Sequence, residues 1–145
     1  MKKSFLILTT VLLLSGCSSQ MPLKKLPCVG SVVKGCQPVV YYNQDSYEIS
    51  PMGKDRLDWV YEKMKRYPRY HLTIKGFSDL QIQDQDHAKR LSYMRAYFAK
   101  DYLVKKGISD TRISAEGLGP KQAICFQDKC QSVNRRIQLE IYKPL

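Results

Sequence analysis

Two charged residues near the middle of the chain have the chemistry of a binding site. Asp79 follows an alternating apolar segment, His71 to Gly76, and Arg95 lies one position off the apolar stripe of the next amphipathic segment. A carboxylate accepts hydrogen bonds, and a guanidinium presents a planar fork of donors. If both residues lie at the same rim, Asp79 can take an ammonium group and Arg95 a carboxylate. The pair would then hold a zwitterion such as the head group of an amino acid.

The same two residues have a simpler interpretation, which is a surface ion pair with each other. Such a pair contributes about 0 to 1 kcal/mol, and spacing alone favours it. No catalytic set appears elsewhere, because the sequence contains no P-loop, no GxGxxG after a strand, no GxSxG and no HExxH. We therefore expect a protein that is not an enzyme and that needs no cofactor.

Hydrophobic periodicity predicts the elements that position these residues. Ser50-Pro51 marks a helix start. The Ser side chain can accept from free backbone N–H groups of the first turn, and Pro lacks an N–H that would need a partner there. Strands are expected at 38–42, 71–76, 112–117 and 136–143, and helices at 51–67 and 87–106. The order βαβαββ predicts an α+β domain, a two-layer sandwich in which two main helices cover one face of a small mixed sheet.

The same periodicity predicts which side chains face the core. The expected apolar face of the first helix comprises Leu57, Val60, Tyr61 and Met64. The expected stripe of the second helix comprises Leu91, Met94, Phe98 and Tyr102. In the last strand, Ile137, Leu139 and Ile141 alternate with polar residues and are expected to face inward.

The N-terminus has the features of a bacterial export signal. Lys2 and Lys3 precede an apolar run of about 10 residues, half of what a membrane span needs. Leu14-Ser15-Gly16-Cys17 resembles the lipobox of bacterial lipoproteins, in which the cysteine is acylated; the alternative is an ordinary signal peptide with a chance cysteine. We expect a signal peptide at 1–16, a lipidated tether at 17–27 and one domain at 28–145. Resemblance to that class, with Ser18 after the cysteine, implies sorting to the outer membrane.

Four cysteines remain once Cys17 is set aside, and an even number in an exported chain indicates disulfides. Three pairings are possible, and we expect the two local ones, Cys28 with Cys36 and Cys125 with Cys130. Metal binding is the competing interpretation. It is weakly supported, because the sequence has no CxxC and its two histidines lie far from both cysteine pairs.

The chain is strongly basic, with 24 Lys and Arg against 13 Asp and Glu and a net charge of +11. This balance favours an anionic or partly anionic partner. Export argues against nucleic acid as that partner. The cations at Lys63, Lys65, Arg66 and Arg69 are most simply interpreted as a solvated helix face.

Several short motifs together resemble the OmpA-like peptidoglycan-binding domain, over about residues 39–142. They are Gly76-Phe77-Ser78-Asp79, Leu91-Ser92-Tyr93-Met94-Arg95-Ala96, Lys106-Gly107-Ile108, Arg112-Ile113-Ser114-Ala115-Glu116-Gly117-Leu118-Gly119 and Asn134-Arg135-Arg136-Ile137. The resemblance implies the same βαβαββ fold. It also implies binding of the diaminopimelate of the peptidoglycan stem, whose free amino acid end is a zwitterion, and so it favours ligand binding over the ion pair.

Residue by residue, the resemblance places the pocket at Asp45, Phe77, Ser78, Asp79, Arg95 and Arg135. Phe77 replaces the histidine usual in the family, and Ala88 replaces an asparagine. The loop at 80–86 is one residue longer than usual and has no glycine. These departures keep open whether the pocket or the fold itself is what this chain uses.

The resulting expectation is a monomeric outer-membrane lipoprotein, with its domain in the periplasm, that holds peptidoglycan non-covalently and links the membrane to the wall. The alternative is a structural subunit of an envelope-spanning complex, such as a secretion system, that uses the same fold for protein docking.

Overall fold

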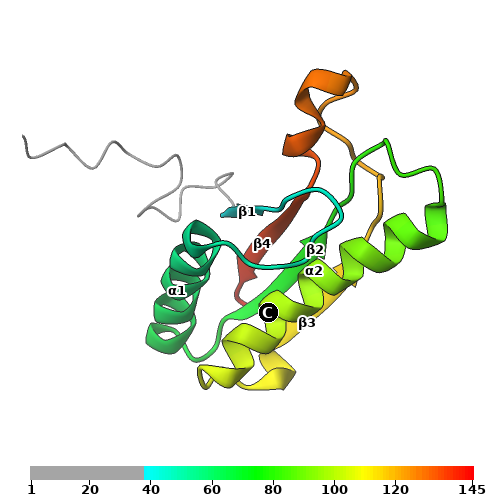
Figure 1. Cartoon of the computed structure of the whole chain (residues 1–145). Helices are drawn as coiled ribbons and strands as arrows, with labels where there is room; N and C mark the ends of the chain where they lie inside the picture. Colours follow the sequence, from blue (N-terminus) through cyan, green and yellow to red (C-terminus); the bar gives the residue numbers. More distant parts are fainter. Residues whose placement is uncertain (1–37) are drawn as a thin grey trace, which may run out of the picture.

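The computed structural model describes residues 38–145, in which four strands form one mixed sheet in the order β1-β4-β2-β3 (Figure 1). The strands are β1 (Val39–Tyr41), β2 (His71–Gly76), β3 (Ile113–Gly117) and β4 (Arg136–Tyr142). β2 and β3 are parallel, whereas β4 runs antiparallel to β1 and β2. The expected α+β fold is confirmed. The expected signal peptide, the tether, Cys17 and the Cys28–Cys36 pair lie outside the described residues.

The two main helices begin at side chains that cap their first turns. In α1 (Pro51–Arg66), Ser50 accepts a hydrogen bond from the Gly53 N–H at 3.1 Å, as the Ser-Pro start predicts. α2 (Gln85–Lys105) begins two residues earlier than expected, because Asp84 caps it through the N–H groups of Asp86 and His87. Two short 3₁₀ helices follow, η1 (Asp110–Arg112) and η2 (Asp128–Val133). In residues 38–145 no helix has the length and apolar character needed to cross a membrane.

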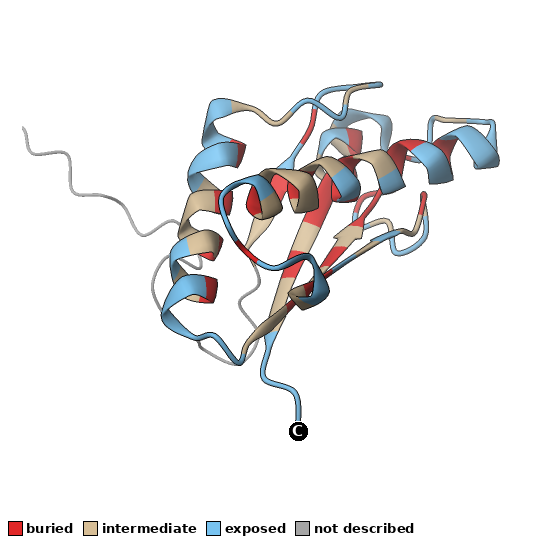
Figure 2. Ribbon diagram, turned by 90° about the horizontal axis from the view of Figure 1, so that it is seen from below, coloured by how far each residue is buried: buried red, intermediate tan, exposed pale blue. Residues whose placement is uncertain are grey.

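Both helices pack on the same face of the sheet (Figure 2). Their buried residues form one core with those of the strands. The core takes Leu57, Val60 and Met64 from α1, Ala96, Ala99 and Leu103 from α2, and Val40, Leu72, Ile74, Ile113, Ile137 and Leu139 from the sheet. The expected inward faces of α1 and of the last strand are thus largely correct, with Tyr61 and Ile141 partly buried at the edge of this core.

The expected stripe of α2 is wrong beyond Leu91. Met94, Phe98 and Tyr102 are only partly buried, and the buried face instead comprises Ala88, Leu91, Ser92, Arg95, Ala96, Ala99 and Leu103. The reason is the closeness of α2 to the sheet. A Cβ added to Gly76 would lie 1.9 Å from the Ser92 carbonyl oxygen, so mainly small side chains fit between them. Arg95 therefore lies on the buried face and not one position off it.

α1 and α2 are also joined by a polar contact at Asp58. Its Oδ1 accepts hydrogen bonds from Lys106 Nζ at 2.6 Å and from the Tyr102 hydroxyl at 2.7 Å. These hydrogen bonds, that of Lys106 first, hold the pKa of the Asp58 carboxyl below its ordinary value. A carboxyl with a lowered pKa in the folded state adds stability above its unfolded pKa and loses it as the pH falls through the folded pKa.

We expect Asp58→Asn to lower the melting temperature at pH 7 by about 1 to 5 °C, because the pair is largely exposed. The difference from wild type should vanish well below pH 3.8, the ordinary carboxyl value. Thermal unfolding followed by circular dichroism over this pH range measures it, with Asp55→Asn on the same helix as the charge-matched control. A difference that is equal at pH 7 and in acid would contradict a role for the ionised carboxyl.

Candidate functional site

The C-terminal end of β2 brings Asp79 next to Arg135. Asp79 lies in the loop between β2 and α2, and its Oδ2 accepts a hydrogen bond from Arg135 Nη1 at 3.1 Å. The Asp79 side chain is only 2% exposed, whereas that of Arg135 is 16% exposed and also donates to the Tyr42 carbonyl oxygen. The surface ion pair that spacing suggested is therefore wrong in both respects, because Asp79 is buried and its partner is Arg135.

Two polar atoms beside this ion pair have no hydrogen-bond partner in the structure. They are Oδ1 of Asp79 and Oγ of Ser78, and both are buried. Buried polar atoms in proteins are nearly always paired, and leaving one unpaired costs about 1 to 3 kcal/mol. A carboxylate oxygen and a hydroxyl on neighbouring residues can both accept from an ammonium group. This half of the site thus has the acceptors that the sequence suggested for a cationic head group.

Arg95 occupies the same end of the sheet and is fully buried. Its guanidinium donates to three backbone carbonyl oxygens, those of Ser46 at 2.8 Å, Phe77 at 3.0 Å and Asn43 at 3.1 Å. It also lies over the Tyr42 ring, 5.3 Å from the ring centroid. Arg95 therefore ties the 43–46 loop to the end of β2, which uses three of its five N–H donors.

Burial and neighbouring charges set the ionisation of this cluster. Burial lowers the pKa of the Arg95 guanidinium to about 10, although the negative charge of Asp79 is among the influences that raise it. Burial raises the pKa of the Tyr42 hydroxyl, because the charged form of a phenol is the deprotonated one. Arg95 thus remains a cation and Tyr42 a neutral phenol at neutral pH. The site keeps two guanidinium groups, of Arg95 and Arg135, close to one carboxylate.

Asp45 and Phe77 have different positions from the other expected site residues. Asp45 has an exposed side chain, and its Oδ1 is 3.7 Å from His87 Nε2 at the start of α2. The Phe77 ring is buried and packs against the guanidinium of Arg136, 4.0 Å from the ring centroid. Phe77 therefore contributes its carbonyl to Arg95, while its ring serves packing. Within residues 38–145 no three His, Cys, Asp or Glu side chains are grouped as metal ligands.

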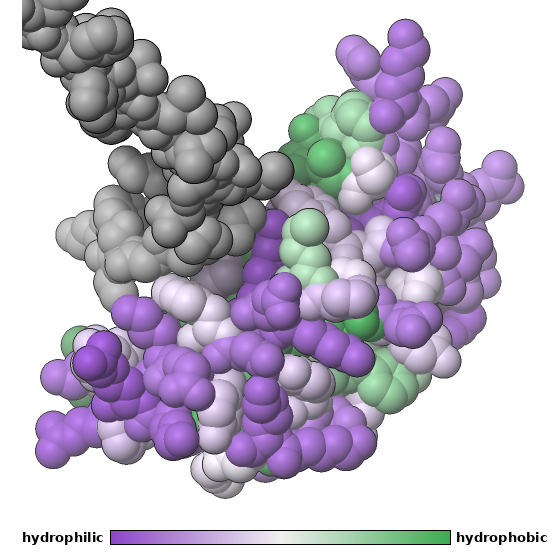
Figure 3. Space-filling model, turned by 60° about the vertical axis from the view of Figure 1, so that its left-hand side comes forward, coloured by the Kyte–Doolittle hydropathy of each residue, from purple (hydrophilic) through white to green (hydrophobic). Residues whose placement is uncertain are grey.

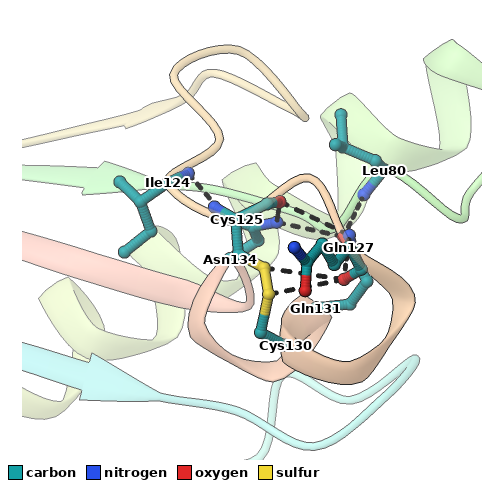
Figure 4. Close-up of a disulfide and its surroundings, with 7 residues drawn as sticks. All are labelled: Leu80, Ile124, Cys125, Gln127, Cys130, Gln131 and Asn134. Atoms are coloured by element: carbon teal, nitrogen blue, oxygen red, sulfur yellow. Dashed lines mark hydrogen bonds between the residues drawn. A yellow bond between two sulfur atoms is a disulfide. The ribbon is translucent and has the colours of Figure 1, made fainter.

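A disulfide loop supports the backbone next to Asp79 (Figure 4). The expected pairing of Cys125 with Cys130 is confirmed, with Cα atoms 5.9 Å apart. Within the loop, Gln131 Oε1 accepts from the Leu80 N–H at 3.1 Å and from Asn134 Nδ2 at 3.0 Å. Sequence reasoning missed the role of Gln131, because nothing in its local pattern shows that it reaches residue 80. The loop thus holds the segment that carries Asp79.

We expect Cys125→Ser combined with Cys130→Ser to lower the free energy of unfolding by about 2 kcal/mol, the loop-closure value for a short loop. Urea unfolding of wild type and of the double variant measures the difference. The double variant is preferable to a reducing agent, since reduction would also act on the other cysteines. Equal stability of the two proteins would show that the hydrogen bonds of Gln131 and Asn134 suffice to hold the loop.

Comparison with known proteins shows which family and which relatives the chain resembles. The OmpA family model matches residues 41–137. The chain is 29% identical over 99 residues to a peptidoglycan-associated lipoprotein of Rhizobium meliloti, with 67% of this chain and 56% of the relative aligned. It is 25% identical over 145 aligned positions to a peptidoglycan-associated lipoprotein of Agrobacterium fabrum, covering 89% and 81% of the two chains.

The fold is also found in solved structures. The crystal structure of the peptidoglycan-associated lipoprotein from Burkholderia pseudomallei superposes with a TM-score of 0.66 at 24% identity, over 72% of this chain and 89% of that one. At this identity the likeness concerns the fold. The chain spans little more than half the length of the Rhizobium relative.

Proposed function

The chain belongs to the OmpA family, and from this premise we propose that it binds peptidoglycan without catalysis and links the outer membrane to the cell wall. The names of the relatives support this proposal, since two of them are peptidoglycan-associated lipoproteins. The observation that carries it is the pair of unpaired buried acceptors, Asp79 Oδ1 and Ser78 Oγ, beside two guanidinium groups. Unpaired acceptors beside guanidinium groups suit a ligand that bears both a positive and a negative charge.

The ligand we propose is the free amino acid end of diaminopimelate in the peptide stem. Its ammonium group would be held by Asp79 Oδ1 and Ser78 Oγ, and its carboxylate by Arg95 and Arg135. Arg135 is the most exposed of the three charged residues and is paired with Asp79, so in this proposal its side chain turns outward to admit the ligand. Asp45, whose negative charge acts on Arg95, supplies a further and exposed acceptor.

The proposal includes an acyl anchor on Cys17, with the domain in the periplasm. A lipid anchor and a wall site on one chain act as two attachments, so that binding at one raises the effective concentration at the other. Even a site of modest affinity would then keep the protein attached to the cell wall. Mass spectrometry of the purified protein would detect the acyl group, and Cys17→Ser should remove it.

We expect Asp79→Asn to reduce binding to purified peptidoglycan about 5- to 150-fold, because loss of one charge-assisted contact costs about 1 to 3 kcal/mol. Co-sedimentation with isolated sacculi measures binding, with free diaminopimelate as competitor and lysine as the comparison ligand. Asp110→Asn is the matched control, because Asp110 is an exposed carboxylate in η1 that pairs with Lys100. Undiminished sedimentation of Asp79→Asn would exclude this site.

A second candidate function is docking to another envelope protein. It is favoured by three exposed apolar side chains around the disulfide loop, Phe126 at 78%, Ile124 at 59% and Leu80 at 41% exposure. A photo-crosslinker at position 126 would capture such a partner in cells. If Asp79→Asn sediments with sacculi as wild type does, and a crosslink forms at position 126, docking is favoured as the main function.

A further inference from the structure

The end of the domain remote from Asp79 carries a concentrated positive surface, which we call the basic end. It comprises Lys63, Lys65, Arg66, Arg69 and Lys143, which line two neighbouring hollows at the C-terminus of α1 and the end of β4. None of these five forms an ion pair with any residue in 38–145. Among the side chains lining the two hollows, that of Glu62 is the one acid, and the backbone carboxylate of Leu145 is the other anionic group there.

Aromatic side chains are interleaved with these cations. Lys63 Nζ lies 5.4 Å from the centroid of the Trp59 ring and 5.9 Å from that of Tyr67, and Lys65 Nζ lies 5.6 Å from that of Tyr61. In the view toward α1, hydrophilic side chains alternate with paler ones of intermediate hydropathy (Figure 3). Lysine and arginine beside amphipathic aromatic rings is the composition that suits the headgroup region of an anionic membrane.

The basic end and the Asp79 site lie at opposite ends of β2. His71 begins the strand beside the basic end, and Gly76 ends it beside the site (Figure 1). The two residues are about 17 Å apart at 3.3 Å per residue. β1 runs in the same direction as β2, because both are antiparallel to β4. The register places Val39 opposite Gln138, which in turn lies opposite Lys75, so β1 lies level with the C-terminal end of β2.

The length of the N-terminal segment leaves the orientation of the domain open. Twenty residues separate Cys17 from Pro38, enough to span up to about 70 Å when extended. Such a tether would let either end of the domain meet the membrane. A preferred orientation must therefore come from the surface of the domain itself.

We propose that the basic end docks on anionic phospholipid headgroups of the membrane to which the chain is anchored, so that the Asp79 site faces away from that membrane. This inference rests on the proposed function for the membrane anchor, and the charge distribution supplies the orientation. Each basic residue near an anionic surface raises the ratio of docked to undocked protein about fivefold. Five cations without an acidic partner are therefore enough to set the orientation at moderate salt.

Trp59 provides a reporter for this docking, because it is the single tryptophan of the chain and lines the basic end. The full chain, purified from membranes, is reconstituted into vesicles of phosphatidylcholine with or without phosphatidylglycerol. A quencher attached to the lipid headgroup then measures the proximity of Trp59 to the membrane. We expect stronger quenching with phosphatidylglycerol, and its loss in 0.5 M salt, where the Debye length falls to about 4 Å.

Arg66→Glu combined with Arg69→Glu should abolish the phosphatidylglycerol-dependent quenching, by lowering the ratio of docked to undocked protein at least about 100-fold. The control is Lys121→Glu with Lys129→Glu, which makes the same charge change at two exposed lysines near the Asp79 end. Glutamine replacements at Arg66 and Arg69 give a milder variant if the reversal impairs folding, which circular dichroism reveals.

Binding to sacculi separates this inference from the proposed function. The variant of Arg66 and Arg69 should sediment with peptidoglycan as wild type does, whereas Asp79→Asn should keep the lipid-dependent quenching. Equal quenching in both vesicle types, or equal losses in the variant and its charge-matched control, would overturn the docking proposal and leave peptidoglycan binding untouched.

Discussion

Replacing Arg95 with methionine is expected to lower the free energy of unfolding by about 2 to 4 kcal/mol. The guanidinium is fully buried and donates to the carbonyl oxygens of Ser46, Phe77 and Asn43, each of which would lose its charged donor. A hydrogen bond to a charged group typically contributes about 1.5 to 3 kcal/mol, and removal of the buried cation offsets part of that loss. Urea unfolding of the purified protein measures the difference.

Two further variants show which property of Arg95 matters. Arg95→Lys keeps the charge but cannot reproduce the planar fork, so we expect an intermediate loss of stability. Arg90→Met is the matched control, because Arg90 lies on the same helix with a side chain that is 68% exposed. A loss for Arg95→Met no larger than that for Arg90→Met would contradict the structural role. A folded Arg95→Lys protein that no longer sediments with sacculi would reveal an additional role in the ligand site.

Replacing Gly76 with alanine is expected to lower the free energy of unfolding by about 3 kcal/mol or more, a large fraction of the stability of an ordinary domain. The added Cβ would lie 1.9 Å from the carbonyl oxygen of Ser92 and 2.8 Å from its carbonyl carbon. Both atoms are backbone, so the clash can be relieved only by moving α2 away from β2. Overpacking in a core costs about 1 to 3 kcal/mol even when flexible side chains can adjust. Chemical denaturation and the yield of soluble protein measure the effect.

Gly107→Ala is the informative comparison for this prediction. An added Cβ there meets no atom within 4 Å, but Gly107 has φ +111°, a conformation that other residues adopt only under strain. We expect a cost of about 1 to 3 kcal/mol from the backbone alone. If Gly76→Ala were the milder of the two changes, contact between α2 and the sheet would not be the constraint that we infer.

Much of the fold follows from local patterns in the chain. Alternation located β2 at residues 71–76 without error, and Ser50-Pro51 located the start of α1, because both signals depend on neighbouring residues alone. The Cys125–Cys130 pairing was also accessible, since only a short loop separates the two residues. The N-cap residue Asp84 lies before the apolar periodicity from which α2 was predicted. The predicted helix therefore starts two residues too late.

The chemistry of the candidate site was accessible in part. Residue types and spacing selected Asp79 and Arg95, and the resemblance to the OmpA-like domain added Arg135 to the group. Local pattern did not show that Asp79 pairs with Arg135, because 56 residues separate them along the chain. Nor did it show that Arg95 donates hydrogen bonds to backbone carbonyl oxygens of two distant segments. Every residue has a carbonyl group, so the sequence does not indicate which of them an arginine contacts.

The amino-acid sequence by itself determined the order of strands and helices and the charged residues available for binding. Each of these depends on side chains within a few positions of one another. Only the tertiary structure decided that small residues of α2 face the sheet, that Arg95 is buried, and that the cations of α1 gather with Lys143 at the end opposite Asp79. Those outcomes depend on how closely backbones approach and on which distant segments meet, and both are set by packing of the whole chain.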